Sequence, residues 1–247
     1  MGLDVYVGPL ARYYAEGPTD VVERIARQQG VPFADGELKR LAQYQDHGIP
    51  EGDQAGPRGT AQASLAEDVV RVAVLSWREG LGRWLGDRLA EPLDWDESGQ
   101  APCFTDKPSW DGYGGTLLLA AHDEHPELAA PATVSADWPD DPAYQAATAP
   151  GAGSRYEQLL TPELWLPCPF GFVVRTQDVT GEEIQIGSSV ALLDQLQLLR
   201  ARHRLDGQVA GPGGDHRLAP TAAAGLAVLL RLAERSVHHR VPMRLDF

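Results

Sequence analysis

The sequence predicts a helix-rich α+β fold in a single domain, with a small, mainly antiparallel sheet. Three observations lead to this prediction. Several segments carry apolar residues at helical spacing, residues 170–187 have the pattern of a β-hairpin, and strands do not alternate regularly with helices as in a doubly wound sheet. A chain of 247 residues can bury roughly 70% of its unfolded surface, so we expect one domain over residues 1–247.

The first elements follow from short local signals. Residues 3–7 alternate apolar and other side chains and predict a strand that a Gly-Pro pair closes. Residues 19–29 predict a helix between a threonine cap and a glycine stop. Residues 46–63 are rich in Gly, Pro and polar side chains, and they predict a mobile loop.

The clearest helix signal in the chain begins at Ser64. Ser64 and Glu67 match a capping box, in which each side chain bonds a backbone N–H that the helix leaves unpaired. Apolar residues then recur on one helix face until a proline stops the pattern. Residues 115–125 predict another helix that a proline ends, and short helical turns are expected at 141–148 and 154–160.

The last third of the chain predicts a hairpin followed by two helices. Strands at 170–177 and 182–187 flank an Asp-Val-Thr-Gly turn. An amphipathic helix starts at Ser188 or Ser189, and a second strong helix starts at Thr221. The N-terminal strand and the hairpin, with the C-terminal tail as a candidate third member, form the expected sheet.

Composition and charge restrict the function classes. No segment approaches the roughly 18 consecutive apolar residues of a membrane span, and the first residues lack a signal-peptide pattern, so we expect a cytoplasmic, bacterial-type protein. The net charge of -14 repels nucleic acid and anionic membranes, but it attracts a basic protein or a cationic ligand. No sequence pattern calls for a cofactor, and the oligomeric state stays open.

Most of the negative charge lies in residues 91–141, which hold twelve carboxylates and one basic residue, Lys107. Three of the six tryptophans fall in the same stretch, each next to an aspartate. These aromatic side chains either pin irregular loops onto the core or form anchors of a surface that binds a basic protein or a cation. The expected partner-binding residues are Asp94, Trp95, Asp96, Trp110, Asp111, Tyr113, Trp138 and Asp140.

The run His122-Asp123-Glu124-His125 suggests a different kind of site. Residues three apart share a helix face, so His122 and His125 can both reach one metal ion. Zinc helices usually offer histidines four apart, and the helix dipole favours histidines in a last turn without any further role. An ordinary helix end is therefore the favoured interpretation, and a metal site is the weaker alternative. A third ligand would come from His216, His238 or His239.

Motifs for nucleophilic catalysis and phosphate binding are absent. The chain has no Gly-x-Ser-x-Gly sequence. Cys103 and Cys168 stand beside prolines rather than cations, so we expect buried thiols of low reactivity. The glycine-rich residues 211–217 match no phosphate loop and predict a connector.

Two functional hypotheses from different classes remain. The first is a non-catalytic binding protein that presents an acidic, aromatic face to a basic protein partner, as immunity proteins and antitoxins do as a class. The second is a small-molecule enzyme, such as a hydrolase, that uses carboxylates and tryptophans of residues 91–141, with a metal at His122 and His125 as an option. A broad acidic face favours the first hypothesis, and a deep pocket with buried carboxylates favours the second.

Overall fold

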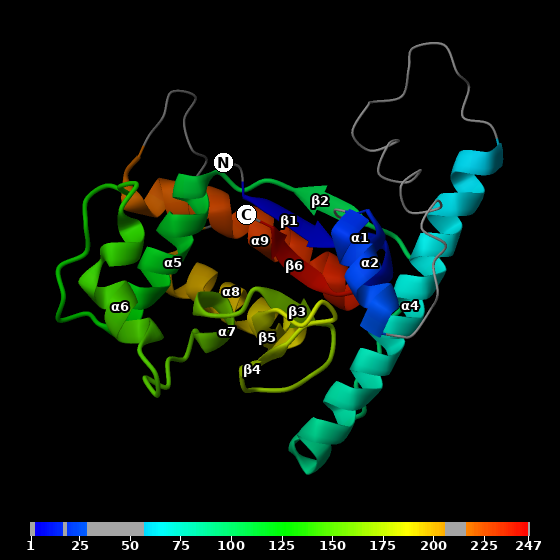
Figure 1. Ribbon diagram of the computed structural model, residues 1–247. Helices are drawn as coiled ribbons and strands as arrows, with labels where there is room; N and C mark the ends of the chain where they lie inside the picture. The colour runs from blue at the N-terminus through cyan, green and yellow to red at the C-terminus, as the bar shows by residue number, and fades with distance from the viewer. Residues whose placement is uncertain (1–2, 17–18, 29–56, 206–215, 247) are drawn as a thin grey trace, which may run out of the picture.

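The computed structural model describes residues 3–16, 19–28, 57–205 and 216–246, which form one mixed sheet with helices on both faces (Figure 1). The strands are β1 (Asp4–Val7), β2 (Phe104–Asp106), β3 (Leu164–Leu166), β4 (Val174–Gln177), β5 (Glu183–Ser188) and β6 (Met243–Asp246). The helices are α1 (Leu10–Ala15), α2 (Thr19–Gln28), α4 (Pro57–Leu85), α5 (Trp110–Glu124), α6 (Pro142–Thr148), α7 (Glu157–Leu160), α8 (Ser189–His203) and α9 (Leu218–His239), with 3-10 turns η1 (Gly86–Arg88) and η2 (Trp138–Asp140).

The sheet is larger than the sequence predicts. Its six strands are ordered β2-β1-β6-β3-β5-β4, and β3 and β5 run parallel while the other neighbours are antiparallel. The fold is α+β, but the expectation of a small sheet built from the N-terminal strand and the hairpin was wrong. Strands β2 and β3 have three residues each, which is too short for an alternating pattern to stand out.

Strand alternation sends side chains into two separate cores, one on each face of the sheet. Val5, Trp165 and Leu245 pack with α5, α8 and α9 on one face. Leu164 and Ile186 pack with α1, α2 and α4 on the other face. One sheet therefore serves both cores of the described residues (Figure 1).

Helices α5 and α9 approach each other closely because small residues line their contact. Gly112 of α5 lies against Gly225 of α9, where an added Cβ would overlap the backbone. The hydroxyl of Ser109 accepts a hydrogen bond from the backbone N–H of Gly112 at 3.0 Å and so caps α5. The helix therefore begins at Trp110, before the predicted segment 115–125.

Helix α4 also begins earlier than predicted, at Pro57 instead of Ser64. This start falls inside the segment 46–63 that the sequence predicts as a loop, and residues 46–56 lie outside the described residues. The C-terminal end of α4 extends beyond the sheet (Figure 1). Within the described part of the chain, no helix is long and apolar enough to cross a membrane.

Candidate functional site

The eight predicted partner-binding residues fall into two groups at opposite ends of α9. Asp94 pairs with Arg240, which follows α9, at 2.8 Å. Asp111 pairs with His216, which precedes α9, at 3.0 Å. Helix α9 has 22 residues, which separates the two groups by about 33 Å at the usual helical rise. The structure therefore divides the predicted surface in two.

In the first group, Trp95 belongs to the core. Its side chain is only 3% exposed, it meets Trp77 edge to face at 6.2 Å, and the guanidinium of Arg78 lies 5.1 Å from its ring centroid. Asp94 and Asp96 are exposed beside it. Asp94 pairs with Arg78 as well as with the residue after α9. The chain's own arginines therefore partly compensate this acidic loop.

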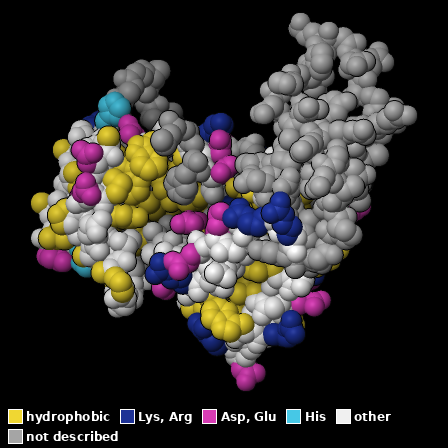
Figure 2. Space-filling view, in the orientation of Figure 1, with side chains coloured by type: hydrophobic (Ala, Val, Ile, Leu, Met, Phe, Trp, Pro, Cys, Tyr) yellow, Lys and Arg dark blue, Asp and Glu magenta, His cyan; other side chains and the backbone are white. Residues whose placement is uncertain are grey.

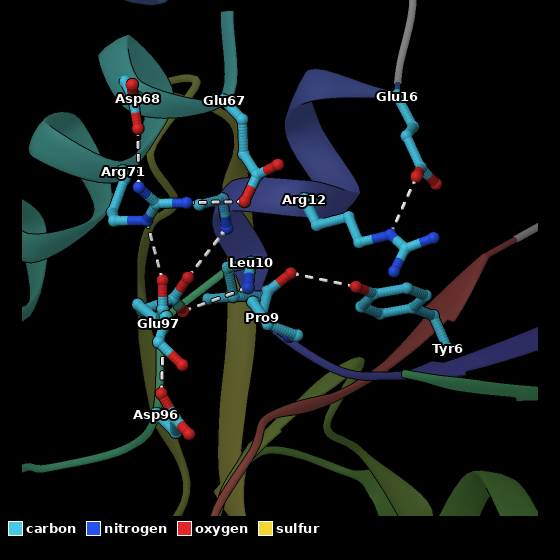
Figure 3. Close-up of polar contacts among 12 residues, drawn as sticks. Tyr6, Pro9, Leu10, Arg12, Glu16, Glu67, Asp68, Arg71, Asp96 and Glu97 are labelled. Atoms are coloured by element: carbon cyan, nitrogen blue, oxygen red, sulfur yellow. Dashed lines mark hydrogen bonds and ion pairs between the residues drawn. The ribbon is translucent and has the colours of Figure 1, made fainter. Parts of the chain in front are cut away.

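Glu97, next to these residues, has a structural role that the sequence pattern does not reveal. Its buried carboxylate accepts hydrogen bonds from the backbone N–H groups of Leu10 and Ala11 at 3.0 and 2.9 Å, and from the indole of Trp95. Arg71 donates to its carbonyl oxygen at 2.7 Å (Figure 3). Burial raises the pKa of Glu97, against the opposing effect of these hydrogen bonds. Glu97 thus caps α1 and ties it to the acidic loop.

The second group surrounds Trp138, which is 5% exposed and has three aromatic neighbours. Ring centroids lie 5.3 Å away for Trp110, 6.0 Å for Tyr113 and 5.2 Å for Tyr144. Tyr113 is buried, whereas Trp110 is 40% exposed. Hydrophobic side chains gather over α5 in Figure 2, with acidic side chains beside them. Of the predicted aromatic residues, Trp110 alone is exposed.

Acidic side chains that neighbour Trp110 or Trp138 in the sequence differ in their partners. Asp137 and Asp140 flank Trp138, are exposed, and have no ion-pair partner among the described residues. Among the described residues, the ion-pair partner of Asp111 is the exposed imidazole of His216. The surface near the start of α9 therefore carries carboxylates whose negative charge is largely uncompensated by the basic side chains that the structure describes.

The two histidines of the His-Asp-Glu-His run face different partners. His122 is buried and its Nε2 lies 3.2 Å from the carboxylate of Asp141. His125 lies 3.1 Å from Glu127. Between them, Asp123 accepts a hydrogen bond from the hydroxyl of Tyr156 at 2.7 Å. The described residues contain no group of three His, Cys, Asp or Glu side chains placed to hold a metal ion.

A cavity of about 550 Å³ lies against the face of β1 and β6 that is opposite α9. Its lining includes Arg244 of β6, Asp178 after β4, and Tyr14 of α1. The Tyr14 hydroxyl donates to Asp178 at 2.8 Å, and Arg244 donates to Asp178 at 3.2 Å and to the Tyr14 hydroxyl. Figure 2 shows acidic and basic side chains beside each other near the centre of the molecular surface that it draws.

These three side chains alter one another's protonation. Burial would raise the pKa of Asp178, but hydrogen bonds from Thr180 and Tyr14 and the charge of Arg244 outweigh it and lower the pKa. Burial raises the pKa of Tyr14 well above its ordinary value. Arg244 and Asp178 are therefore charged and Tyr14 neutral near neutral pH.

Sequence reasoning missed this cavity, and none of the eight predicted residues lines it or a second cavity of about 590 Å³ at the end of α4. The available signal was the polar residue at every second position of "DVYV" and "MRLD", which indicates strands with one polar face.

Comparisons with protein-family models, with characterised proteins and with solved structures find no match for this chain.

Proposed function

We propose that this protein is a non-catalytic binding protein, and that the surface around Trp110 binds a basic region of a protein partner. The observation that carries the proposal is an exposed tryptophan whose ring packs on Trp138, the residue that Asp137 and Asp140 flank in the sequence. These two carboxylates have no ion-pair partner among the described residues. An immunity-like or antitoxin-like role is a form of this function.

Trp110 has the properties of an interface anchor. Its ring is held against the buried ring of Trp138, at a centroid distance of 5.3 Å, so little side-chain entropy remains to be lost on binding. Tryptophan is among the residues that contribute most to binding energy at protein interfaces. A held, exposed indole therefore supports contact with a partner.

The charges at this surface favour a basic partner. Elsewhere in the acidic stretch, carboxylates are paired with the chain's own arginines, as in Asp94 with Arg240 and Asp123 with Arg202. Asp137 and Asp140 lack such partners in the described part of the chain. Uncompensated surface carboxylates speed association with a basic protein through long-range attraction.

Catalysis in the same stretch has less support. Asp94 and Asp96 are both exposed, whereas a general acid and base pair needs a site in which burial differs between the two carboxyl groups. The buried acid of this loop, Glu97, uses its carboxylate to cap α1. These contacts favour binding over hydrolysis.

The test compares variants in a pull-down from a bacterial lysate at low and high salt, followed by affinity measurement with the retained protein. Trp110→Ala should weaken binding about thirtyfold, which corresponds to about 2 kcal/mol. The double variant Asp137→Asn, Asp140→Asn should bind more slowly and with less dependence on salt.

Two control variants make the result interpretable. Trp84→Ala removes an even more exposed tryptophan, 58% exposed at the far end of α4, and should leave binding unchanged. Asp194→Asn, on the exposed side of α8, removes one charge elsewhere. Equal binding by Trp110→Ala and wild type, with both folded by circular dichroism, would refute the proposal.

A further inference from the structure

One face of the sheet changes from apolar to polar halfway across. Residues paired across neighbouring strands point to the same face, and one such row crosses all six strands. From β4 to β2 the row contains Val174, Ile186, Leu164, Arg244, Tyr6 and Thr105. The apolar half packs in the core with α1, α2 and α4, and the polar half lines the cavity of about 550 Å³.

Two carboxylates stand opposite each other in the next row of this polar half. Asp4 of β1 and Asp246 of β6 are directly paired in the antiparallel register, and both line the cavity. Like charges directly opposite each other destabilise a sheet. Lys107 pairs with Asp4 at 2.9 Å, but its side chain is highly exposed, so the ion pair is weak. The fold therefore retains an unfavourable contact at the cavity floor.

The cationic side chains of the cavity wall already have acidic partners. Asp178 pairs with Arg244, and Glu182 pairs with Arg24 at 3.2 Å. The lining holds five carboxylates and three cationic side chains, and one of the five, Glu16, pairs with Arg12 outside the lining. The remaining charge of the cavity is negative, which attracts a cation.

Two further features of the wall point to a small ligand. The rings of Tyr6 and Tyr13 lie 5.3 Å apart, and aromatic faces attract ammonium and guanidinium groups. The guanidinium of Arg244 already lies 4.9 Å from the ring centroid of Tyr13, which leaves Tyr6 as the ring for a ligand cation. The Nε–H of Arg244, a lining residue, has no acceptor among the described residues. Because this nitrogen is enclosed, a ligand oxygen reaches it only when the side chains over it move, and it would then satisfy the donor. The cavity volume lies within the range of small-molecule sites.

We propose that this cavity binds a compound that carries an ammonium or guanidinium group, held between Asp4 and Asp246, and an oxygen acceptor for Arg244. This chemistry occurs in small amino compounds and in the lysine and arginine side chains of peptides. The cavity is on the sheet face opposite α5, so the proposal does not depend on partner binding around Trp110.

The experiment is an NMR titration of the intact protein with matched probes. γ-Aminobutyramide carries an ammonium and an amide oxygen, butyramide lacks the ammonium, and butylammonium lacks the oxygen. γ-Aminobutyramide should bind saturably and at least about tenfold more tightly than butyramide, since one lost charge interaction of this kind is worth at least a factor of ten. A capped lysine tripeptide tests the other source, and tighter binding by either probe identifies which source the site prefers.

Variants connect binding to the two carboxylates. Asp4→Asn and Asp246→Asn should each weaken γ-aminobutyramide binding at least about tenfold, and Asp194→Asn should not. Without probe, Asp4→Asn should raise the melting temperature, because it removes the repulsion from Asp246. A residue with a purely structural role would not combine better stability with weaker binding.

Three results would overturn the proposal. The first is that none of γ-aminobutyramide, butylammonium and the lysine tripeptide binds saturably. The second is equal binding of butyramide and γ-aminobutyramide, because the site would then ignore charge. The third is unchanged binding by both Asn variants, because the cation would then lie elsewhere.

Discussion

Gly225 of α9 lies against the backbone of Gly112 in α5, and a Cβ at Gly225 would overlap the Gly112 carbonyl group. The close approach of these two helices depends on that missing side chain. Helix α5 carries Trp110, and α9 spans the distance between the two acidic groups, so this contact positions the proposed binding surface.

Gly225→Ala should destabilise the protein by about 1–3 kcal/mol, because the helices must move apart to accept the methyl group. Urea denaturation measures the change as a lower midpoint with an unchanged slope. Gly80→Ala in α4 is the matched control, since its Cβ meets no atom within 4 Å, and it should stabilise by about 0.5–1 kcal/mol. Equal effects of the two substitutions would contradict the close helix contact.

Glu97→Ala should destabilise the protein by about 2 kcal/mol, because the backbone N–H groups of Leu10 and Ala11 lose their acceptor at the start of α1. Asp96→Ala, at the exposed neighbouring acid, should change stability by less than about 0.5 kcal/mol. Thermal denaturation of both variants provides the measurement. A harmless Glu97→Ala would mean that α1 does not need this cap.

Asp178→Asn should reduce the stability of the fold at neutral pH, and the stability of this variant should fall less than that of wild type as the pH is lowered. The folded-state pKa of Asp178 is lowered, so its stabilising contribution is present above the unfolded pKa of about 3.9 and is lost as the pH falls through the folded pKa. Urea midpoints measured between neutral and strongly acidic pH should therefore fall less steeply for Asp178→Asn than for wild type. Parallel curves would exclude a lowered pKa for this carboxyl group.

Cys168 should not react with a thiol reagent until the protein unfolds. The thiol is buried and donates to the carbonyl oxygen of Asp94 at 3.3 Å, and burial raises its pKa. In a Cys103→Ala variant, native titration should detect no fast thiol, and titration in denaturant should detect one. Rapid native labelling of that variant would show that Cys168 is accessible as a thiolate.

Local signals in the sequence were enough to predict several elements. One such element is the hairpin of β4 and β5, because its turn forms through contacts between near neighbours in the sequence. The Asp178 carboxylate accepts a hydrogen bond from the Thr180 backbone N–H at 2.8 Å, and Gly181 takes a positive φ. Helices α8 and α9 and the strands at both ends of the chain were also expected from patterns of similar range. Such signals predict the type of an element, although α4, α5 and α9 begin before their expected starts.

Only the tertiary structure decided which tryptophans are buried and where the cavity lies. Trp95, Trp110 and Trp138 share the same Trp-Asp neighbourhood in sequence, yet only Trp110 is exposed, because burial depends on residues from other elements such as Trp77 and Gly114. The cavity joins side chains from β1, α1, the turn after β4, and β6. The sequence by itself determined where most helices, the strands β1, β4, β5 and β6, and the acidic charge lie along the chain. The insertion of β6 between β1 and β3, a long-range pairing without a local signal, decided which of those charges meet.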